Sequence, residues 1–312
     1  MEETAEIIYS LSEPVYPDRT EITSSVFKHR KKIKAVLFDL YGTLMVSSAG
    51  DISASREKAD SDPGGDLFIK ALKYCLPVSG GTPGGEMIPC GLENKKGLIK
   101  SLFYLEITRA REKMQKQGNP SPEVDIVEIW RSVLSQAGIT AKSRKDIEKT
   151  AAAYEAMANR TWPMPGMEKT LDRLTNAGAV TGIISNAQFY SPLLFCAYTG
   201  KTPEQIGFHK DFCLWSYQHG ISKPDPYLFR KAVSALEKKR GISASDTLFV
   251  GNDMLNDIKP ARETGMVTAL FAGDSKSLRL RKDMEDVNNI KPDYILTSLN
   301  QVLIILGLQN GV

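Results

Sequence analysis

Short apolar segments alternate with segments of helical period along most of this chain. The apolar runs predict strands at Ile33–Phe38, Val180–Ile184, Phe212–Trp215, Leu248–Val250, Val267–Phe271 and Tyr294–Leu296. Helical spacing predicts helices at Met167–Asn176, Pro226–Lys239 and Asp257–Thr264, and a last helix through Leu306. Strands that alternate with helices form parallel sheets with right-handed crossovers and helices on both faces. We therefore expect an α/β fold built on a doubly wound, Rossmann-like parallel sheet.

A long stretch after the first strand interrupts this alternation. Residues 46–162 carry helical periods and Gly/Pro-rich loops, which predict an inserted helical domain. The expected helices are one that ends near Lys116, one from Pro122 to Gly138 capped by Ser121, and one over Ser143–Arg160. The core domain then comprises residues 31–45 and 163–312. Prolines break residues 1–30, which we expect to pack loosely as an N-terminal extension.

Polar residues follow the ends of several predicted strands. They are Asp39, Gly42 and Thr43 after the first strand, Ser185 and Asn186 after the second, Lys223 in a proline-flanked loop, and Asp253 and Asp257 after the Leu248–Val250 strand. Because the carboxyl ends of parallel strands meet at one edge of a sheet, we expect these side chains to converge there. A carboxylate beside the backbone amides of a tight loop is well placed to act as a nucleophile.

The order of these motifs resembles that of the haloacid dehalogenase (HAD) superfamily. The resemblance covers residues 33–45 and 165–300, through Asp39-x-Tyr41-Gly42-Thr43, Ser185-Asn186, Lys223-Pro224 and Asp253-x-x-Asn256-Asp257. It implies that Asp39 is the nucleophile, that Ser185 and Lys223 assist it, and that Asp253 and Asp257 are the metal-binding acids. It also implies that the helical insertion is a cap of the family's C1 type, which covers the site and contributes substrate contacts.

The family reaction has two steps, in which Asp39 forms an aspartyl intermediate and water then hydrolyses it. For a small phosphorylated metabolite, the resemblance implies that the developing charge is stabilised by Lys223, by Ser185 and Asn186, and by the Gly42–Thr43 loop. Mg²⁺ would be held by Asp39, Asp253, Asp257 and a backbone carbonyl, that of Tyr41, with water completing the octahedron. We therefore expect a magnesium-dependent phosphoryl hydrolase.

Tyr41 departs from the pattern of the family's phosphatases. These enzymes usually carry a second aspartate at this catalytic position, as general acid toward the leaving alcohol, and a phenol with a pKa of about 10 is poorly matched to that task. Dehalogenases of the family carry Asp-x-Tyr-Gly-Thr, work without metal and place an arginine in the cap near the halide; Arg56 is nearby in the sequence but is not matched to that role. A 2-haloacid dehalogenase is therefore the alternative, and a weakly active phospholigand-binding protein is a third hypothesis.

Composition and charge narrow the class of protein further. The chain has 312 residues, 42% of them hydrophobic, and a net charge of +3. It has no stripe of basic residues interleaved with aromatics, the pattern that would indicate a nucleic-acid partner. Its four cysteines form no CxxC pair, which favours reduced thiols. The N-terminus lacks the apolar region of a signal peptide, and no segment reaches the ~20 apolar residues of a membrane span. We expect a cytoplasmic monomer or homodimer that acts on a small molecule and does not bind membranes.

Overall fold

A six-stranded parallel sheet forms the centre of the protein. A computed structural model describes residues 2–29, 32–49, 64–76 and 91–308. In spatial order the strands are β5 (Cys213–Trp215), β4 (Val180–Ser185), β1 (Ala35–Phe38), β6 (Thr247–Gly251), β7 (Val267–Phe271) and β8 (Tyr294–Leu296). Ala35 lies opposite Val180 on one side and Thr247 on the other, and every neighbouring pair of strands is parallel. The predicted α/β class is confirmed.

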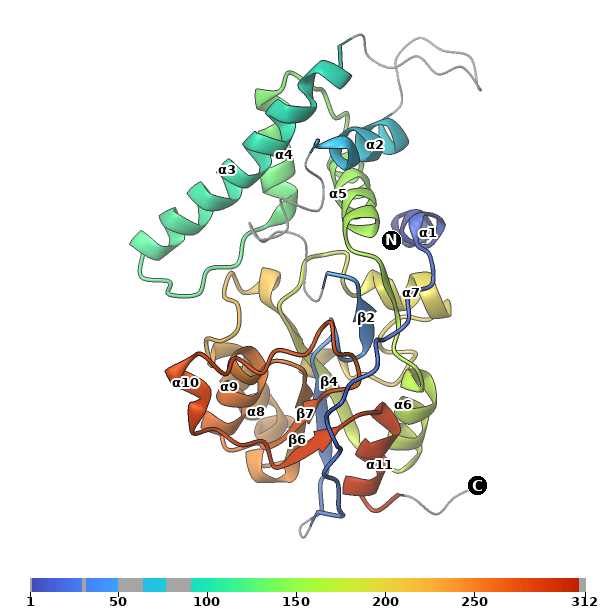
Figure 1. The fold of residues 1–312 in the computed structure, drawn as a ribbon, viewed down its shortest axis with the longest axis vertical. Helices are drawn as coiled ribbons and strands as arrows, with labels where there is room; N and C mark the ends of the chain where they lie inside the picture. Colours follow the sequence, from blue (N-terminus) through green and yellow to red (C-terminus); the bar gives the residue numbers. More distant parts are fainter. Residues whose placement is uncertain (1, 30–31, 50–63, 77–90, 309–312) are drawn as a thin grey trace.

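Helices cover both faces of the sheet because its strands are apolar on both sides (Figure 1). Val36 and Phe38 of β1 belong to one apolar cluster and Ala35 and Leu37 to another, as alternation along a strand requires. The first cluster includes residues of α6 (Met167–Asn176) and α11 (Val302–Ile305), and the second includes residues of α8 (Tyr227–Arg240) and α9 (Lys259–Glu263). Two shorter helices, α7 (Leu193–Thr199) and α10 (Glu285–Asn288), lie in the connections.

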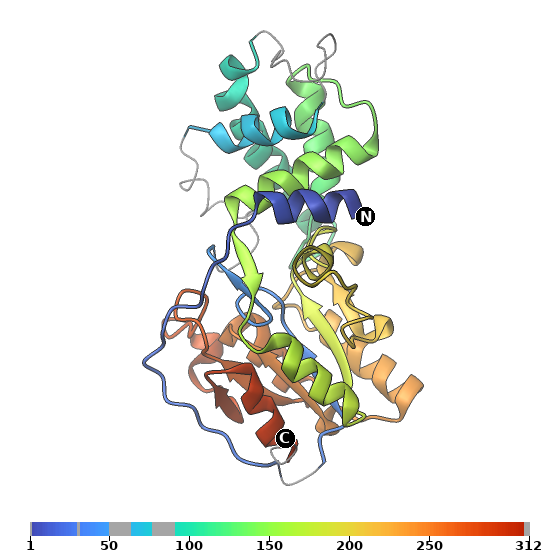
Figure 2. The ribbon, with the colours of Figure 1, turned by 90° about the vertical axis from the view of Figure 1, so that its right-hand side faces the viewer.

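The chain leaves the sheet and returns to it through a two-stranded antiparallel ribbon. This ribbon pairs β2 (Met45–Ser47) with β3 (Thr161–Pro163). Between them lie the insertion helices α2 (Asp66–Cys75), α3 (Lys96–Lys116), α4 (Ile126–Gln136) and α5 (Arg144–Ala158). Figures 1 and 2 show these helices as a separate layer beyond the carboxyl ends of the strands. Four aromatic rings hold them together, with centroids 4.3 to 5.6 Å apart: Phe68, Phe103, Trp130 and Tyr154.

Two elements of the insertion differ from the sequence prediction. Helix α4 begins at Ile126 with Asp125 as its N-cap, four residues later than predicted. The preceding segment is extended instead, because Pro122 pairs with Ile221 in the loop before Lys223. Helix α2 was not predicted at all. A third difference lies in the core, where the helix predicted from Asp257 starts as a π-helical turn over Met254–Ile258 and continues as α9.

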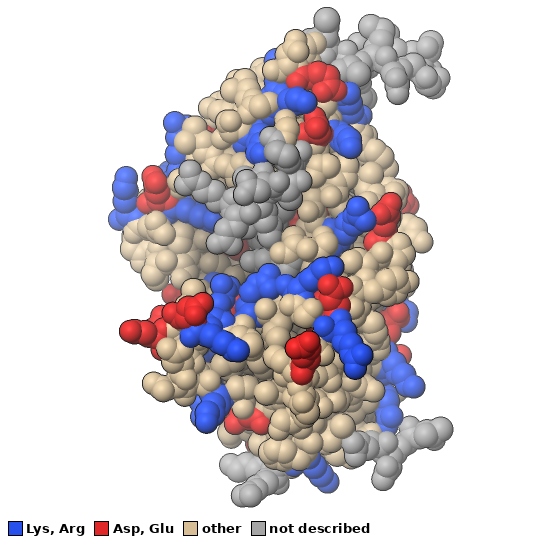
Figure 3. All heavy atoms as spheres, viewed as in Figure 1, with Lys and Arg blue, Asp and Glu red and all other residues tan. Residues whose placement is uncertain are grey.

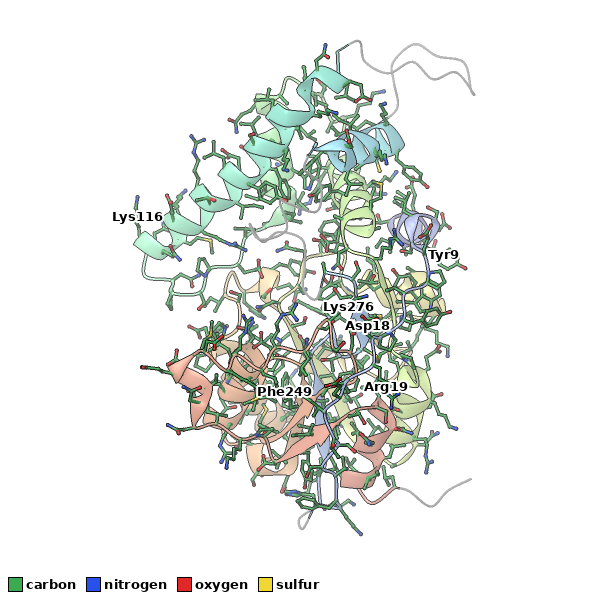
Figure 4. The ribbon with its side chains drawn as sticks, in the orientation of Figure 1. Tyr9, Asp18, Arg19, Lys116, Phe249 and Lys276 are labelled. Atoms are coloured by element: carbon green, nitrogen blue, oxygen red, sulfur yellow. The ribbon has the colours of Figure 1, made fainter. Side chains whose placement is uncertain are left out.

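The N-terminal residues form a packed helix rather than a loose extension. Helix α1 (Glu2–Leu11) contacts α5 of the insertion and α7 of the core, and it buries Ala5 and Ile8. Figure 2 shows it lying across the boundary between these two parts. Further along, Asp18 pairs with Lys276, which follows β7, at 3.1 Å, and the two residues are labelled side by side in Figure 4. Among the described helices, none is both long and apolar enough to cross a membrane.

Candidate active site

The predicted site residues do converge at the carboxyl edge of the sheet. Asp39 follows the last residue of β1, and Ser185 is the last residue of β4. Asp253 lies two residues after the end of β6, and Lys223 lies in the loop between β5 and α8. Since β4, β1 and β6 are adjacent in the sheet, their ends bring these groups together from positions more than 200 residues apart in the chain.

Lys223 is the centre of this site. Its Nζ donates to Asp39 Oδ1 at 2.7 Å, to Asp257 Oδ1 at 2.6 Å and to the carbonyl oxygen of Ile184 at 3.2 Å. The residue is only 5% exposed, so a lone ammonium group here would carry a large desolvation cost. Three acceptors match its three N–H donors, and the lysine therefore fixes the orientation of both carboxylates.

The buried charges shift the pKa values of Lys223 and Asp257. Burial by itself would lower the pKa of Lys223, but the Asp257 and Asp39 carboxylates outweigh it and raise that pKa above its ordinary value. Burial raises the pKa of Asp257 from 3.8 to about 7; Lys223 opposes this shift, and the Asp39 and Asp253 carboxylates add to it. Lys223 is therefore held in its charged form, and the Asp257 carboxyl binds a proton more tightly than an ordinary aspartate does.

Asn186 holds the Lys223 loop in place. Its side-chain oxygen accepts from the Lys223 backbone N–H at 2.7 Å, and its Nδ2 donates to the Lys223 carbonyl at 3.1 Å. The oxygen and the nitrogen of the Asn186 side-chain amide are thus both hydrogen-bonded to the main chain of Lys223. The neighbouring residue Ser185 is 1% exposed, and its hydroxyl donates to the carbonyl of Asn186 at 3.1 Å. These contacts make Asn186 a positioning residue for Lys223.

The Gly42 turn packs directly against Asn252. Gly42 has φ of 79°, and a Cβ atom there would lie 2.5 Å from Asn252 Nδ2, so only glycine fits. The Thr43 hydroxyl donates to Asn252 Oδ1 at 3.3 Å, and the Asp39 N–H donates to the carbonyl of Val250 at 2.9 Å. The loop that follows Asp39 is thereby fixed to the loop that follows β6.

Tyr41 directs its hydroxyl toward the interior. The hydroxyl is hydrogen-bonded to Ser191 Oγ at 2.9 Å, and the residue is 4% exposed. Ser191 Oγ also accepts from the backbone N–H of Gln188 at 3.1 Å. The side chain at the position of the family's general acid is therefore part of a buried polar cluster beside α7.

Asp253 is engaged by a residue that the sequence did not single out. Arg281 donates to its two carboxylate oxygens, with Nε 3.2 Å from Oδ1 and Nη2 2.7 Å from Oδ2. The same carboxylate caps the following turn, accepting from the backbone N–H groups of Leu255 and Asn256 and from Asn256 Nδ2. A signal was present in the sequence, because the segment after β7 carries four basic residues: Lys276, Arg279, Arg281 and Lys282.

The carboxylates at this edge of the sheet are of the chemical type that binds Mg²⁺, but in this structure their oxygens accept hydrogen bonds from other groups of the protein. Asp39 and Asp253 are carboxylates, the ligands that Mg²⁺ prefers. Within the described ranges, however, no group of three His, Cys, Asp or Glu side chains is arranged to hold a metal ion. Asp257, one of the acids expected to bind metal, accepts from Lys223 and from the Asp253 N–H at 3.0 Å. Arg56, the arginine near the first strand in sequence, lies outside the described residues.

Comparison with known proteins agrees with this geometry. The family model described as "haloacid dehalogenase-like hydrolase" matches residues 33–265, which is most of the chain and includes every site residue discussed above except Arg281. The chain is a haloacid dehalogenase-like hydrolase. The resemblance seen in the motifs is thus confirmed, and with it the assignment as an enzyme.

Two curated relatives of this hydrolase are named as phosphatases. It is 30% identical over 154 residues to a protein of Pyrococcus furiosus named "Glyceraldehyde 3-phosphate phosphatase", a match that covers 47% of the chain and 56% of the relative. A protein of Methanocaldococcus jannaschii with the same name is 30% identical over 149 residues, with 46% and 56% covered. The chain thus spans about half the length of these curated relatives.

A solved structure shows the same fold. The 2-haloacid dehalogenase of Pseudomonas syringae aligns with this hydrolase over 88% of the chain and 98% of its own length, with a TM-score of 0.50 and 20% sequence identity. At that identity the likeness concerns the fold alone. The family and the phosphatase relatives, rather than this neighbour, carry the functional argument.

Proposed function

We propose that this hydrolase cleaves a phosphate ester of a small metabolite and uses Asp39 as its nucleophile. The observation that carries the proposal is the contact between Lys223 and Asp39 at the end of the central strand β1. Lys223 Nζ holds one carboxylate oxygen at 2.7 Å and, by orienting the group, leaves the other oxygen to attack phosphorus. The phosphatase names of the archaeal relatives favour a phosphate ester as substrate.

The reaction would proceed in two displacements. In the first, an Asp39 oxygen bonds to phosphorus while the ester P–O bond breaks, and the leaving group departs with the electron pair and takes a proton from solvent. In the second, water attacks phosphorus of the aspartyl phosphate, which releases inorganic phosphate and restores the Asp39 carboxylate. Lys223, the Ser185 hydroxyl and the backbone amides after Asp39 would stabilise the negative charge on the phosphoryl oxygens. Asn186 keeps Lys223 in position for both steps.

Mg²⁺ completes this proposal as a cofactor. It would be held by Asp39, Asp253 and the backbone carbonyl of Tyr41. The positive charge that it supplies would offset the repulsion between an anionic nucleophile and an anionic substrate.

The decisive experiment is phosphate release by Asp39→Asn. The panel contains glyceraldehyde 3-phosphate, other short alkyl phosphates and p-nitrophenyl phosphate, each with Mg²⁺ and with EDTA. We expect Asp39→Asn to lower the rate by more than about 10³-fold, since the amide is a poor nucleophile. Aryl esters should react faster than alkyl esters, because the Tyr41 hydroxyl bonds to Ser191 and does not supply a proton to the leaving group.

A matched control is Asp211→Asn. Asp211 is a surface carboxylate that pairs with Lys239 at 2.7 Å, so the same chemical change there should leave turnover within about twofold. Full activity of Asp39→Asn would overturn the assignment of the nucleophile. Full activity of the wild type in EDTA would remove the role of Mg²⁺.

The second candidate function is hydrolysis of a 2-haloacid without metal. Two observations favour it: the Tyr41 hydroxyl is committed to Ser191, and Asp253 is paired with Arg281. A halide leaves without a proton, so this chemistry needs no general acid at Tyr41. Chloride release from 2-chloropropionate in EDTA, without phosphate release from any ester, would establish it. Binding of phosphorylated ligands without either activity would instead support a weakly active binding protein.

A further inference from the structure

Arg281 and Asp253 form a bidentate ion pair at the edge of the proposed site. The two N–H···O distances are 3.2 and 2.7 Å, and the side chains of Arg281 and Asp253 are 31% and 9% exposed. Asp253 accepts five hydrogen bonds in all, three of them from Leu255 and Asn256. Because a carboxylate offers about four lone-pair positions, this arrangement leaves no free position for a metal ion.

The loop that carries Arg281 is built to hold it there. The Arg279 carbonyl accepts from the Met254 N–H at 2.9 Å, and the Arg279 N–H donates to the Asn252 carbonyl at 3.0 Å, so the loop runs alongside Asp253. On its other side, Asp18 bonds to Ser275 and pairs with Lys276. Arg281 itself has φ of 53° and is the single non-glycine residue with positive φ in the described part of the chain. Such a conformation persists only where surrounding contacts impose it.

Charge explains why Asp253 has this partner. Three carboxyl groups gather here, those of Asp39, Asp253 and Asp257, and Lys223 contacts only the first and the last of them. Arg281 supplies a second cation and neutralises the third carboxylate. Figure 3 shows Lys and Arg side chains across the middle of this face, between the helical insertion and the sheet.

We propose that Arg281 competes with the divalent cation for Asp253 and so sets the metal affinity of the enzyme. Arg281 is the counter-ion of Asp253 in this structure, and binding of a metal ion to Asp253 would require the guanidinium to give up at least one carboxylate oxygen. The Asp253 carboxylate can then form either the ion pair with Arg281 or the complex with the metal ion. Because the two states are thermodynamically linked, the ion pair weakens metal binding and metal binding weakens the ion pair. This inference rests on the metal dependence of the proposed function.

The test is calorimetric titration of the whole 312-residue chain with Mg²⁺ alone, compared between wild type and Arg281→Gln. Removal of the competing charge should tighten Mg²⁺ binding about tenfold, within the range typical of coupled ligands. The matched control is Arg279→Gln in the same loop. The Arg279 guanidinium bonds to the carbonyl oxygens of Lys276 and Leu278, so its loss should leave the affinity within about twofold.

A thermal measurement gives a second readout that needs no activity. In EDTA, Arg281→Gln should unfold at a lower temperature than the wild type, because Asp253 loses its counter-ion. Saturating Mg²⁺ should raise the midpoint of the variant more than that of the wild type, since tighter binding stabilises the folded state more. If Arg281→Gln does not fold, Arg281→Lys, which keeps the charge without the fork, should show an intermediate affinity.

The outcomes separate this inference from the proposed function. Equal or weaker Mg²⁺ binding by Arg281→Gln, when the wild type binds Mg²⁺ and Asp253→Asn does not, would overturn the competition and leave the metal role intact. Absence of Asp253-dependent binding in both the wild type and Arg281→Gln would overturn the inference together with the metal part of the proposed function.

Discussion

Lys223 neutralises two buried carboxylates, and its removal tests how much the site depends on one ammonium group. Lys223→Met leaves Asp39 and Asp257 without their shared cation. Loss of one partner of a buried ion pair typically costs about 3–5 kcal/mol, and we expect the free energy of unfolding at pH 8 to fall by this amount. Lys239→Met, which removes an exposed lysine from its pair with Asp211, should cost less than about 1 kcal/mol.

The same variant should respond to pH in a definite direction. The pKa of Asp257 is already raised from 3.8 to about 7, so protonation of this carboxyl stabilises the folded state. That stabilisation is lost as the pH rises through 7. Without Lys223 that pKa rises further, and at pH 5 the carboxyl is neutral. The destabilisation by Lys223→Met should therefore be smaller at pH 5 than at pH 8, as measured by urea unfolding at both values. A larger loss at pH 5 would contradict the described charge arrangement.

At the scale of elements, the aromatic cluster is what holds the insertion helices together. Trp130 is fully buried, and its ring centroid lies 5.4 to 5.6 Å from those of Phe68, Phe103 and Tyr154. Trp130→Ala should cost about 3–5 kcal/mol through the cavity it leaves. Hydrogen exchange should accelerate in α3, α4 and α5 and change little in β1, β4 and β6, because all four aromatic rings belong to helices of the insertion.

A conservative change at the same position serves as the comparison. Within the described structure the Trp130 Nε1–H has no hydrogen-bond partner, so Trp130→Phe removes a buried donor that is already unsatisfied. It should therefore be clearly milder than Trp130→Ala. Equal acceleration of exchange in the sheet and in the insertion would show that the two parts unfold as one unit.

At the scale of the molecule, helix α1 links the insertion to the core domain through α5 and α7. Ile8 is 2% exposed on a helix that contacts both α5 and α7. The Ser12 hydroxyl continues the link by bonding to the Tyr198 hydroxyl of α7 at 2.9 Å. Ile8→Ala should lower the free energy of unfolding by about 2–5 kcal/mol. We expect it to weaken the coupling between the insertion and the core more than it destabilises either of them.

The coupling is measured by comparing two probes of thermal unfolding. Tryptophan fluorescence and far-ultraviolet circular dichroism should give coincident transitions in the wild type and separated transitions in Ile8→Ala. Tyr9→Ala is the control, since this neighbouring side chain is 57% exposed and is labelled at the outer edge of α1 in Figure 4. Coincident transitions in Ile8→Ala would mean that α1 does not couple the two parts.

The sequence by itself determined the sheet and the positions of its chemical groups. The apolar runs predicted β1, β4, β6, β7 and β8 to within about two residues, because a strand buried on both faces must be apolar along its whole length. Strand ends meet at one edge of a parallel sheet, so the convergence of Asp39, Ser185, Lys223 and Asp253 also followed from the pattern. These features depend on local periodicity and on the geometry common to parallel sheets.

Only the tertiary structure decided what each polar group touches. Helix α4 begins later than predicted because Pro122 pairs with Ile221. Helix α1 was not predicted, because its partners α5 and α7 lie far away in sequence. The inward turn of the Tyr41 hydroxyl depends on Ser191, and the pairing of Asp253 depends on Arg281, which lies 28 residues further along the chain. Hydrogen bonds and ion pairs are set by distances of a few ångströms between distant segments, and no periodicity along the chain encodes such distances.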